Sequence, residues 1–325
     1  MYLRFVVRIF FGNRSYALLM LPLLIAGYAA LNLWKGHHEP HVGVSFGFWG
    51  HLLSQSTYLS QFLAGSLILA NGIVLNILFN RNGFMESNNF LPALLYVSFL
   101  SIFHSFYYLD GFSIAQSLLI IGLYQLLKLN QNEDARRIVF NAAFIIGVAC
   151  TFYPVLLVII PFLFWMIWVI RPFIFRESTL TVVGFVIPLI FAGVYDTVYN
   201  IHLSGPELSG TSSELWLEDV AVLGGIVLFM IVLGIGRLLL KLKQSSIRLK
   251  KLFRVIIILA NFSLLLSIFE YFVFHKKEAL SLVFIPLMFF LPYSFGYKKQ
   301  RGVTTAVFYL LFFFSVGKFF YPLAF

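Results

Sequence analysis

Imidazole and carboxylate side chains are concentrated in one short run near the N-terminus. Three histidines and a glutamate, His37, His38, Glu39 and His41, lie within five residues. Their nitrogen and oxygen atoms are donors that zinc, iron and copper prefer. The run lacks the H-x-x-x-H or H-E-x-x-H spacing with which one helix holds two metal ligands. One prediction is therefore a metal site at His37, His38 and His41, and the alternative is a set of solvated loop histidines.

A second group of polar residues interrupts two apolar segments. In residues 90–109 they recur at three- and four-residue steps, which places them on one helical face: Ser98, Ser101, His104, Ser105 and Tyr108. In residues 255–274 the same spacing joins Ser263, Ser267 and Glu270. Asp110 directly follows the first stripe. Because polar groups are costly in lipid and turn toward a cavity or a partner, we expect a cleft in which His104, Asp110 and Glu270 act as acid, base or metal ligand. Hydrogen bonds between helices are the alternative.

The composition excludes an ordinary water-soluble enzyme. Of the 325 residues, 60% are hydrophobic and only 11% are charged, whereas soluble domains have about 25% charged residues. The only cysteine, Cys150, allows no intrachain disulfide and no zinc site built from cysteines. The apolar run 16–34 is longer than the core of a signal peptide and has no small-residue cleavage site, so we expect it to remain as the first span.

Apolar segments long enough to cross ~30 Å of hydrocarbon as helices recur along the whole chain. They are residues 16–34, 57–79, 90–109, 112–129, 179–199, 219–240, 255–274, 279–296 and 303–322. Residues 138–170 are too long for one helix and contain Tyr153-Pro154 near their middle, so we expect a tight hairpin of two short spans there. The sequence thus predicts one all-α integral membrane domain over residues 1–325, a polytopic bundle of about eleven spans.

The distribution of basic residues predicts the orientation of these spans. With the N-terminus in the cytoplasm, all but four of the 23 lysines and arginines lie on the cytoplasmic side; the exceptions are Lys35, Lys276, Lys277 and Lys318. The net charge of +10 is therefore explained by membrane topology and not by nucleic-acid binding. Residues 241–254 form the main basic cytoplasmic loop and can lie against anionic headgroups.

Two outer loops follow from this topology, residues 35–56 and 200–218. The first contains Phe46, Phe48 and Trp49 among polar residues, which is typical of a short amphipathic element at the membrane interface. All seven histidines face this outer compartment: His37, His38, His41, His51, His104, His202 and His275. We therefore expect any chemistry to face outward.

Residues 89–177 resemble an uncharacterised family of bacterial inner-membrane proteins that is classed only as a domain of unknown function. The resemblance is carried by Leu91-Pro92-Ala93-Leu94-Leu95-Tyr96, Phe140-Asn141-Ala142-Ala143-Phe144 with Gly147, Tyr153-Pro154, and Arg171-Pro172-Phe173 with Arg176-Glu177. It covers about a quarter of the chain and implies a multi-pass protein of a bacterial inner membrane.

The chain is more faintly similar to polytopic transferases and polymerases that use lipid-linked sugars. The shared features are a first span, a long outer loop with an interfacial element, and a series of spans of which some are short. Such proteins place an acidic residue early in that loop, where it binds a metal or acts as a base. In this sequence the matching residue is Glu39.

Three functions are compatible with the sequence. The first is an enzyme that acts on a lipid-carried substrate at the outer face, through Glu39, His104, Asp110 and Glu270. The second is a non-catalytic subunit or scaffold that binds membrane protein partners in envelope assembly. The third is a membrane-bound non-haem iron oxygenase with a carotenoid-like substrate. Apart from a metal ion, the sequence identifies no cofactor.

Overall fold

The structure is a computed structural model that describes residues 10–12, 16–35, 47–49, 57–103, 106–129, 135–199, 217–274, 279–296, 301–317 and 319–320. Every regular element in these ranges is helical, in the following order. The elements are α2 (Tyr16–Lys35), η2 (Gly47–Trp49), α3 (Thr57–Arg81), α4 (Leu91–Leu100), α5 (Gly111–Leu126), α6 (Arg136–Phe152), η4 (Pro154–Val158), α7 (Ile159–Ile170), α8 (Phe175–Tyr199), α9 (Leu217–Gln244), α10 (Ile247–Phe274), α11 (Leu280–Leu287), η5 (Leu291–Phe295) and α12 (Arg301–Gly317). The predicted all-α fold is confirmed for these residues.

Five of the described helices are long and apolar enough to cross a membrane: α2, α3, α8, α9 and α10. Many of their large apolar side chains point outward, such as Leu23 on α2 and Phe191 on α8. In water such side chains would form an exposed apolar surface, whereas in a bilayer they contact lipid. The fold is therefore that of a membrane protein, as the composition predicts.

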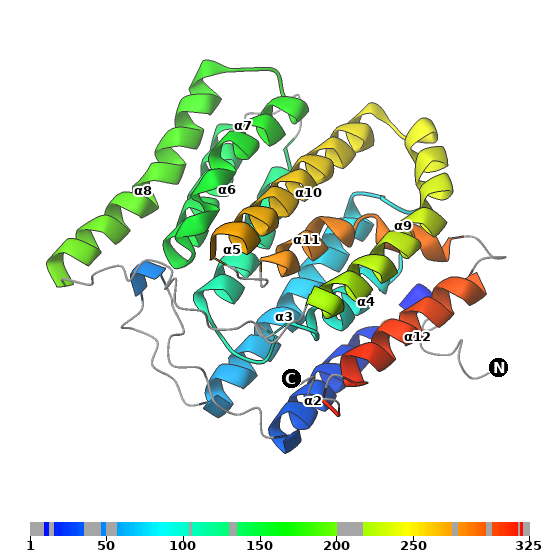
Figure 1. Ribbon diagram of the computed structural model, residues 1–325. Coiled ribbons are helices and arrows are strands. Elements are labelled where there is room, and N and C mark those ends of the chain that lie inside the picture. The colour runs from blue at the N-terminus through cyan, green and yellow to red at the C-terminus, as the bar shows by residue number, and fades with distance from the viewer. Residues whose placement is uncertain are drawn as a thin grey trace.

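Two short helices lie in the interior of the bundle. All ten residues of α4 are buried, and α4 packs against α3, α11 and α12. Phe99 of α4 stacks on Phe284 of α11, with ring centroids 4.8 Å apart. A helix that is apolar on all sides is expected to be buried on all sides. Figure 1 shows α11 beside the much longer α10.

The segments 90–109 and 279–296, expected as continuous spans, are both interrupted. The first is α-helical only to Leu100: the Ile102 and Phe103 amides donate to carbonyls three residues back, and the Tyr107 hydroxyl donates to the Ser101 carbonyl (2.6 Å). The second contains Pro286 and Pro292 and continues after α11 as a turn and the 3-10 helix η5. Each segment is therefore a short helix followed by irregular backbone, which is tolerated inside a membrane protein where protein surrounds it.

The chain breaks at Tyr153, between α6 and η4, where the proline was expected to divide residues 138–170. The two halves do not form the expected tight hairpin, since α6 packs mainly on α5 and α8 while α7 packs on α10. Residues 241–254, expected as a loop, are helical except at Ser245 and Ser246. The long helices α9 and α10 extend through this basic segment and meet in a tight turn (Figure 1).

Candidate anion-binding site at the basic end of the bundle

Basic residues from several helices meet at one end of the bundle. Three contacts connect this end: Arg81 Nη1 donates to the Tyr124 hydroxyl (3.2 Å), Lys251 Nζ donates to the Ile170 carbonyl (2.9 Å), and Arg237 donates to the Gly296 carbonyl. These contacts join the ends of α3 and α5, the end of α7 to the start of α10, and α9 to the residue after η5. We call this the basic end.

Two contacts at the opposite end join uncharged groups. The Trp49 indole donates to the Thr151 hydroxyl (2.9 Å), and its ring packs on Tyr195. The Leu109 amide donates to Ser60 Oγ (2.8 Å). Trp49 belongs to the segment expected as an interfacial element. In the part of the chain that is described, its side chain is half-buried against the ends of α6 and α8.

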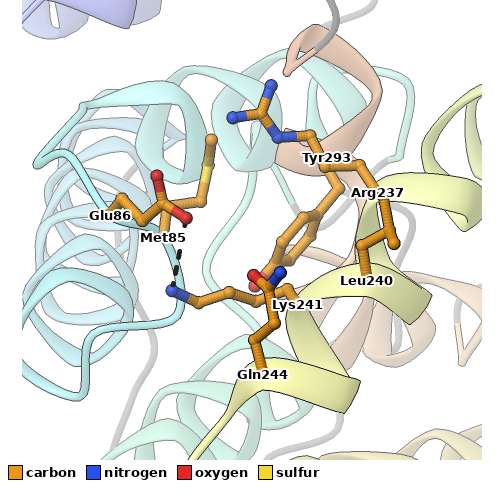
Figure 2. Close-up of a pocket in the computed structure, with 7 residues that line it drawn as sticks. All are labelled: Met85, Glu86, Arg237, Leu240, Lys241, Gln244 and Tyr293. Atoms are coloured by element: carbon orange, nitrogen blue, oxygen red, sulfur yellow. Dashed lines mark ion pairs between the residues drawn. The ribbon is translucent and has the colours of Figure 1, made fainter.

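Two adjoining cavities open at the basic end. The first, about 230 Å³, is lined by Met85, Glu86, Arg237, Leu240, Lys241, Gln244 and Tyr293. The second, about 370 Å³, is lined by Phe11, Met85, Glu86, Ser87, Arg237, Gly296 and Arg301. Met85, Glu86 and Arg237 line both. We call the two cavities chamber one and chamber two. In Figure 2, Lys241 extends from α9 toward Glu86 across chamber one.

The loop that follows α3 forms one wall of both chambers. Asn80 closes this loop: its amide nitrogen donates to the Asn89 carbonyl (2.8 Å), and its amide oxygen accepts from the Asn89 backbone N–H (3.2 Å). Gly83 has a φ of +69°, a left-handed conformation that glycine adopts without strain. The Tyr293 hydroxyl donates to the Phe84 carbonyl and so ties the loop to η5. Together these contacts fix the positions of the residues that line the chambers.

The two arginines are held by backbone carbonyls. Arg237 donates to the carbonyl of Gly296, and Arg301 Nε donates to the carbonyl of Phe295 (3.1 Å). The Arg301 guanidinium also lies over the Phe11 ring, 4.0 Å from its centroid. A guanidinium has five N–H donors in a planar fork, so anchoring one of them orients the group. Both guanidinium groups are thus positioned before any ligand arrives.

The charge around the chambers is unbalanced. Arg237, Lys241 and Arg301 line them together with one carboxylate, Glu86, whose Oε1 lies 4.0 Å from Lys241 Nζ and whose side chain is 75% exposed. Burial lowers the pKa of the Arg301 guanidinium, and the nearby charge of Arg237 lowers this pKa further. Two arginines that repel each other beside one exposed acid form a site that is stabilised by a bound anion.

Asp110, predicted as a site residue, begins α5 as its N-cap. Its Oδ1 accepts from the Ser113 backbone N–H (2.7 Å), while Ser113 Oγ accepts from the Asp110 N–H (3.1 Å). This reciprocal pair is a capping box, which satisfies backbone donors at the start of a helix. The capping role gives the aspartate a structural function at this position.

Glu270, the other predicted site residue among those described, is fully buried on α10. Its Oε1 accepts a hydrogen bond of 2.6 Å from the Tyr153 hydroxyl, and the Phe112 ring packs edge-on against Tyr153 with 5.1 Å between the ring centroids. The first residues of α5 therefore lie next to the partner of Glu270. Neither Asp110 nor Glu270 lines the two chambers.

Several serines of the predicted stripes bond to backbone carbonyls. Ser101 donates to the Ser98 carbonyl (2.7 Å), Ser263 to that of Ala260 (3.0 Å), and Ser267 to those of Ser263 (2.7 Å) and Ala279 (2.9 Å). The contact between Ser267 and Ala279 joins α10 to the start of α11. The other three bonds are local, so the bond between Ser267 and Ala279 is the one that favours the helix-packing alternative for the second stripe.

The remaining predicted site residues, His37, His38, Glu39, His41 and His104, lie outside the described residues. The predicted metal site is therefore not tested. In the part of the chain that is described, no three histidine, cysteine, aspartate or glutamate residues lie together as metal ligands would.

The residues that line the chambers were not predicted as a site. Arg237 and Lys241 are four residues apart on α9, a spacing that places both on one helix face. This spacing is the feature of the sequence that indicates a site, but membrane orientation also explains the positive charge of both residues. Their convergence with Arg301 depends on how η5 and α12 pack on α9.

No protein-family model, no curated protein and no solved structure matches the chain. The two family resemblances of the sequence therefore stay predictions.

Proposed function

We propose that this is a multi-pass membrane protein that binds the phosphate group of a membrane lipid at its basic end. The observation that carries the proposal is the convergence of Arg237, Lys241 and Arg301 on adjoining cavities that, among the described residues, are lined by a single carboxylate. Arginine and lysine are the usual partners of phosphate, and preoriented guanidinium groups bind it with several hydrogen bonds.

The surroundings of chamber one favour a lipid over a soluble anion. Leu240 lines the chamber and is 52% exposed, and Phe229, which lies eleven residues earlier on the same side of α9, is exposed as well. A headgroup in the chamber would leave its acyl chains along this exposed surface of α9. A soluble anion would gain nothing from that surface.

Lipid binding can be tested with purified protein by native mass spectrometry, with phosphatidylglycerol compared with phosphatidylcholine. Arg237→Gln should weaken phosphatidylglycerol binding by about tenfold or more, because a charge-assisted hydrogen bond contributes about 1.5–3 kcal/mol. Arg254→Gln is the control, since Arg254 is exposed on α10 near the same end and lines neither chamber. Equal binding of both lipids, or equal losses in both variants at equal thermal stability, would contradict the proposal.

The orientation belongs to the same proposal. The N-terminus and the basic end face the cytoplasm of a bacterial cell, the chain crosses the inner membrane about eleven times, and residues 200–218 lie outside. Support comes from the gathering of basic residues at one end of the bundle. Reporter fusions at residues 133 and 210 should appear in opposite compartments. Both reporters in one compartment would exclude this topology.

A non-catalytic scaffold in envelope assembly is the second candidate. It is favoured by the structural roles of Asp110 as an N-cap and of the serines in packing. The outer-face enzyme and the iron oxygenase depend largely on residues outside the described part of the chain. Metal analysis of the purified protein tests the oxygenase directly, because that function requires bound iron.

A further inference from the structure

The two chambers share Met85, Glu86 and Arg237, and each has a cation of its own. Arg237 belongs to both, Lys241 lies only in chamber one, and Arg301 lies only in chamber two. A water molecule takes about 30 Å³ in the liquid, so chambers of about 230 and 370 Å³ each have room for a hydrated phosphate. A single phosphodiester has one negative charge, whereas the described residues that line the two chambers include three cations and one carboxylate.

The start of α12 adds to the positive potential of chamber two. Arg301 is the first residue of this helix, and the first turn contains no acidic residue. The N-terminus of a helix has a partial positive charge, which makes a basic residue there unfavourable unless an anion is nearby. Thus Arg301 opposes the helix dipole and is also repelled by Arg237, and an anion in chamber two would relieve both repulsions.

From this arrangement we infer that the ligand is a diphosphate, with one phosphoryl group in each chamber and Arg237 between them. The inference rests on the proposed function, since it specifies the lipid phosphate as a lipid diphosphate. Three cations against one carboxylate suit a group with two or three negative charges better than a phosphodiester with one. Arg237 is suited to the shared position because its planar fork can donate to two oxygens at once.

Glu86 lines both chambers, and its replacement tests whether the ligand is negatively charged. Its carboxylate repels any anion in the site and pairs with Lys241 across 4.0 Å. Removal of this charge by Glu86→Gln should therefore tighten anion binding, about two- to fivefold for an exposed carboxylate. A lining residue with only a structural role would not strengthen binding when it is replaced.

The experiment measures dissociation constants of the purified full-length protein for three probes: farnesyl diphosphate, farnesyl monophosphate and inorganic pyrophosphate. The wild type should bind farnesyl diphosphate about tenfold more tightly than the monophosphate, because the second phosphoryl group adds a charge-assisted contact. It should bind inorganic pyrophosphate more weakly than farnesyl diphosphate, since pyrophosphate lacks the apolar chain.

Single variants test whether each chamber binds one phosphoryl group. Lys241→Gln and Arg301→Gln should each remove most of the preference for the diphosphate while binding of the monophosphate is retained, because either phosphoryl group can use the chamber that stays intact. Lys250→Gln is the control, since Lys250 is exposed on α10 and lines neither chamber. Thermal stability of each variant separates lost contacts from lost folding.

The outcomes distinguish this inference from the proposed function. Equal affinity for the two farnesyl probes would overturn the diphosphate while lipid-phosphate binding stands. If inorganic pyrophosphate bound as tightly as farnesyl diphosphate, the site for two phosphoryl groups would be supported, but the proposal that the ligand is a lipid would be overturned. If neither the farnesyl probes nor phosphatidylglycerol bound, both proposals would fail.

Discussion

Alanine in place of Gly147 should separate α6 from α8 and destabilise the protein by about 1–3 kcal/mol, the usual cost of overpacking. A Cβ atom at this position would lie 2.5 Å from the carbonyl oxygen of Phe185 and 3.2 Å from its Cα. Both atoms belong to the backbone of α8, so no side chain can rotate away. On the facing helix, a Cβ at Gly184 would lie 2.8 Å from the Phe140 carbonyl oxygen. Small residues at such crossings allow helices in membranes to approach closely.

Gly193→Ala is the matched control, because it makes the same change on α8 where a Cβ would have no atom within 4 Å. Alanine has the higher helix propensity by up to about 1 kcal/mol, so this variant should be neutral or slightly stabilised. Thermal unfolding in detergent measures both variants. The expected shifts in melting temperature therefore differ in sign, and two shifts of the same sign and size would contradict the proposed contact.

The long helices could be predicted from the sequence because each depends on a local property. A run of apolar residues such as Leu217–Gln244 must satisfy its backbone within the helix wherever it meets lipid. After Leu100 the chain changes to hydrogen bonds three residues back, and the Tyr107 hydroxyl bonds to the Ser101 carbonyl once the chain has turned. Residues 90–109 are apolar on both sides of this break, so hydropathy does not show where it falls.

The two chambers at the basic end could not be predicted, because the positions of the basic residues had two explanations. Lysines and arginines gather on the cytoplasmic side of membrane proteins in general, so Arg237 and Arg301 needed no site to explain them. Their spatial relation is set by contacts of sequence-distant residues, such as those of Arg237 with Gly296 and of Tyr293 with Phe84. The acidic residues show the opposite case, because they were predicted as site residues. A helix cap now explains Asp110 in part, and a buried hydrogen bond explains Glu270 in part.

Phenylalanine in place of Tyr153 should destabilise the protein by about 1.5–3 kcal/mol, since it removes the hydroxyl that donates to the buried Glu270 carboxyl group. The distance of 2.6 Å lies at the short end of the range for O–H···O hydrogen bonds. Burial makes the contact expensive to break, because water cannot take the place of the lost donor. Tyr271→Phe is the control: it removes a hydroxyl from the next residue of α10, which is only half-buried, and should stay within about 0.5 kcal/mol of the wild type.

A double-mutant cycle with Glu270→Leu decides whether the two side chains act as a pair. Leucine at 270 alone leaves the Tyr153 hydroxyl without this acceptor, and phenylalanine at 153 alone leaves the carboxyl group without this donor. The double variant replaces both partners with apolar groups, and it should therefore lose less stability than the sum of the single losses, by about 1–3 kcal/mol. Additive losses would show that the hydrogen bond contributes nothing, and Glu270 would then need another reason to lie fully buried in an apolar helix.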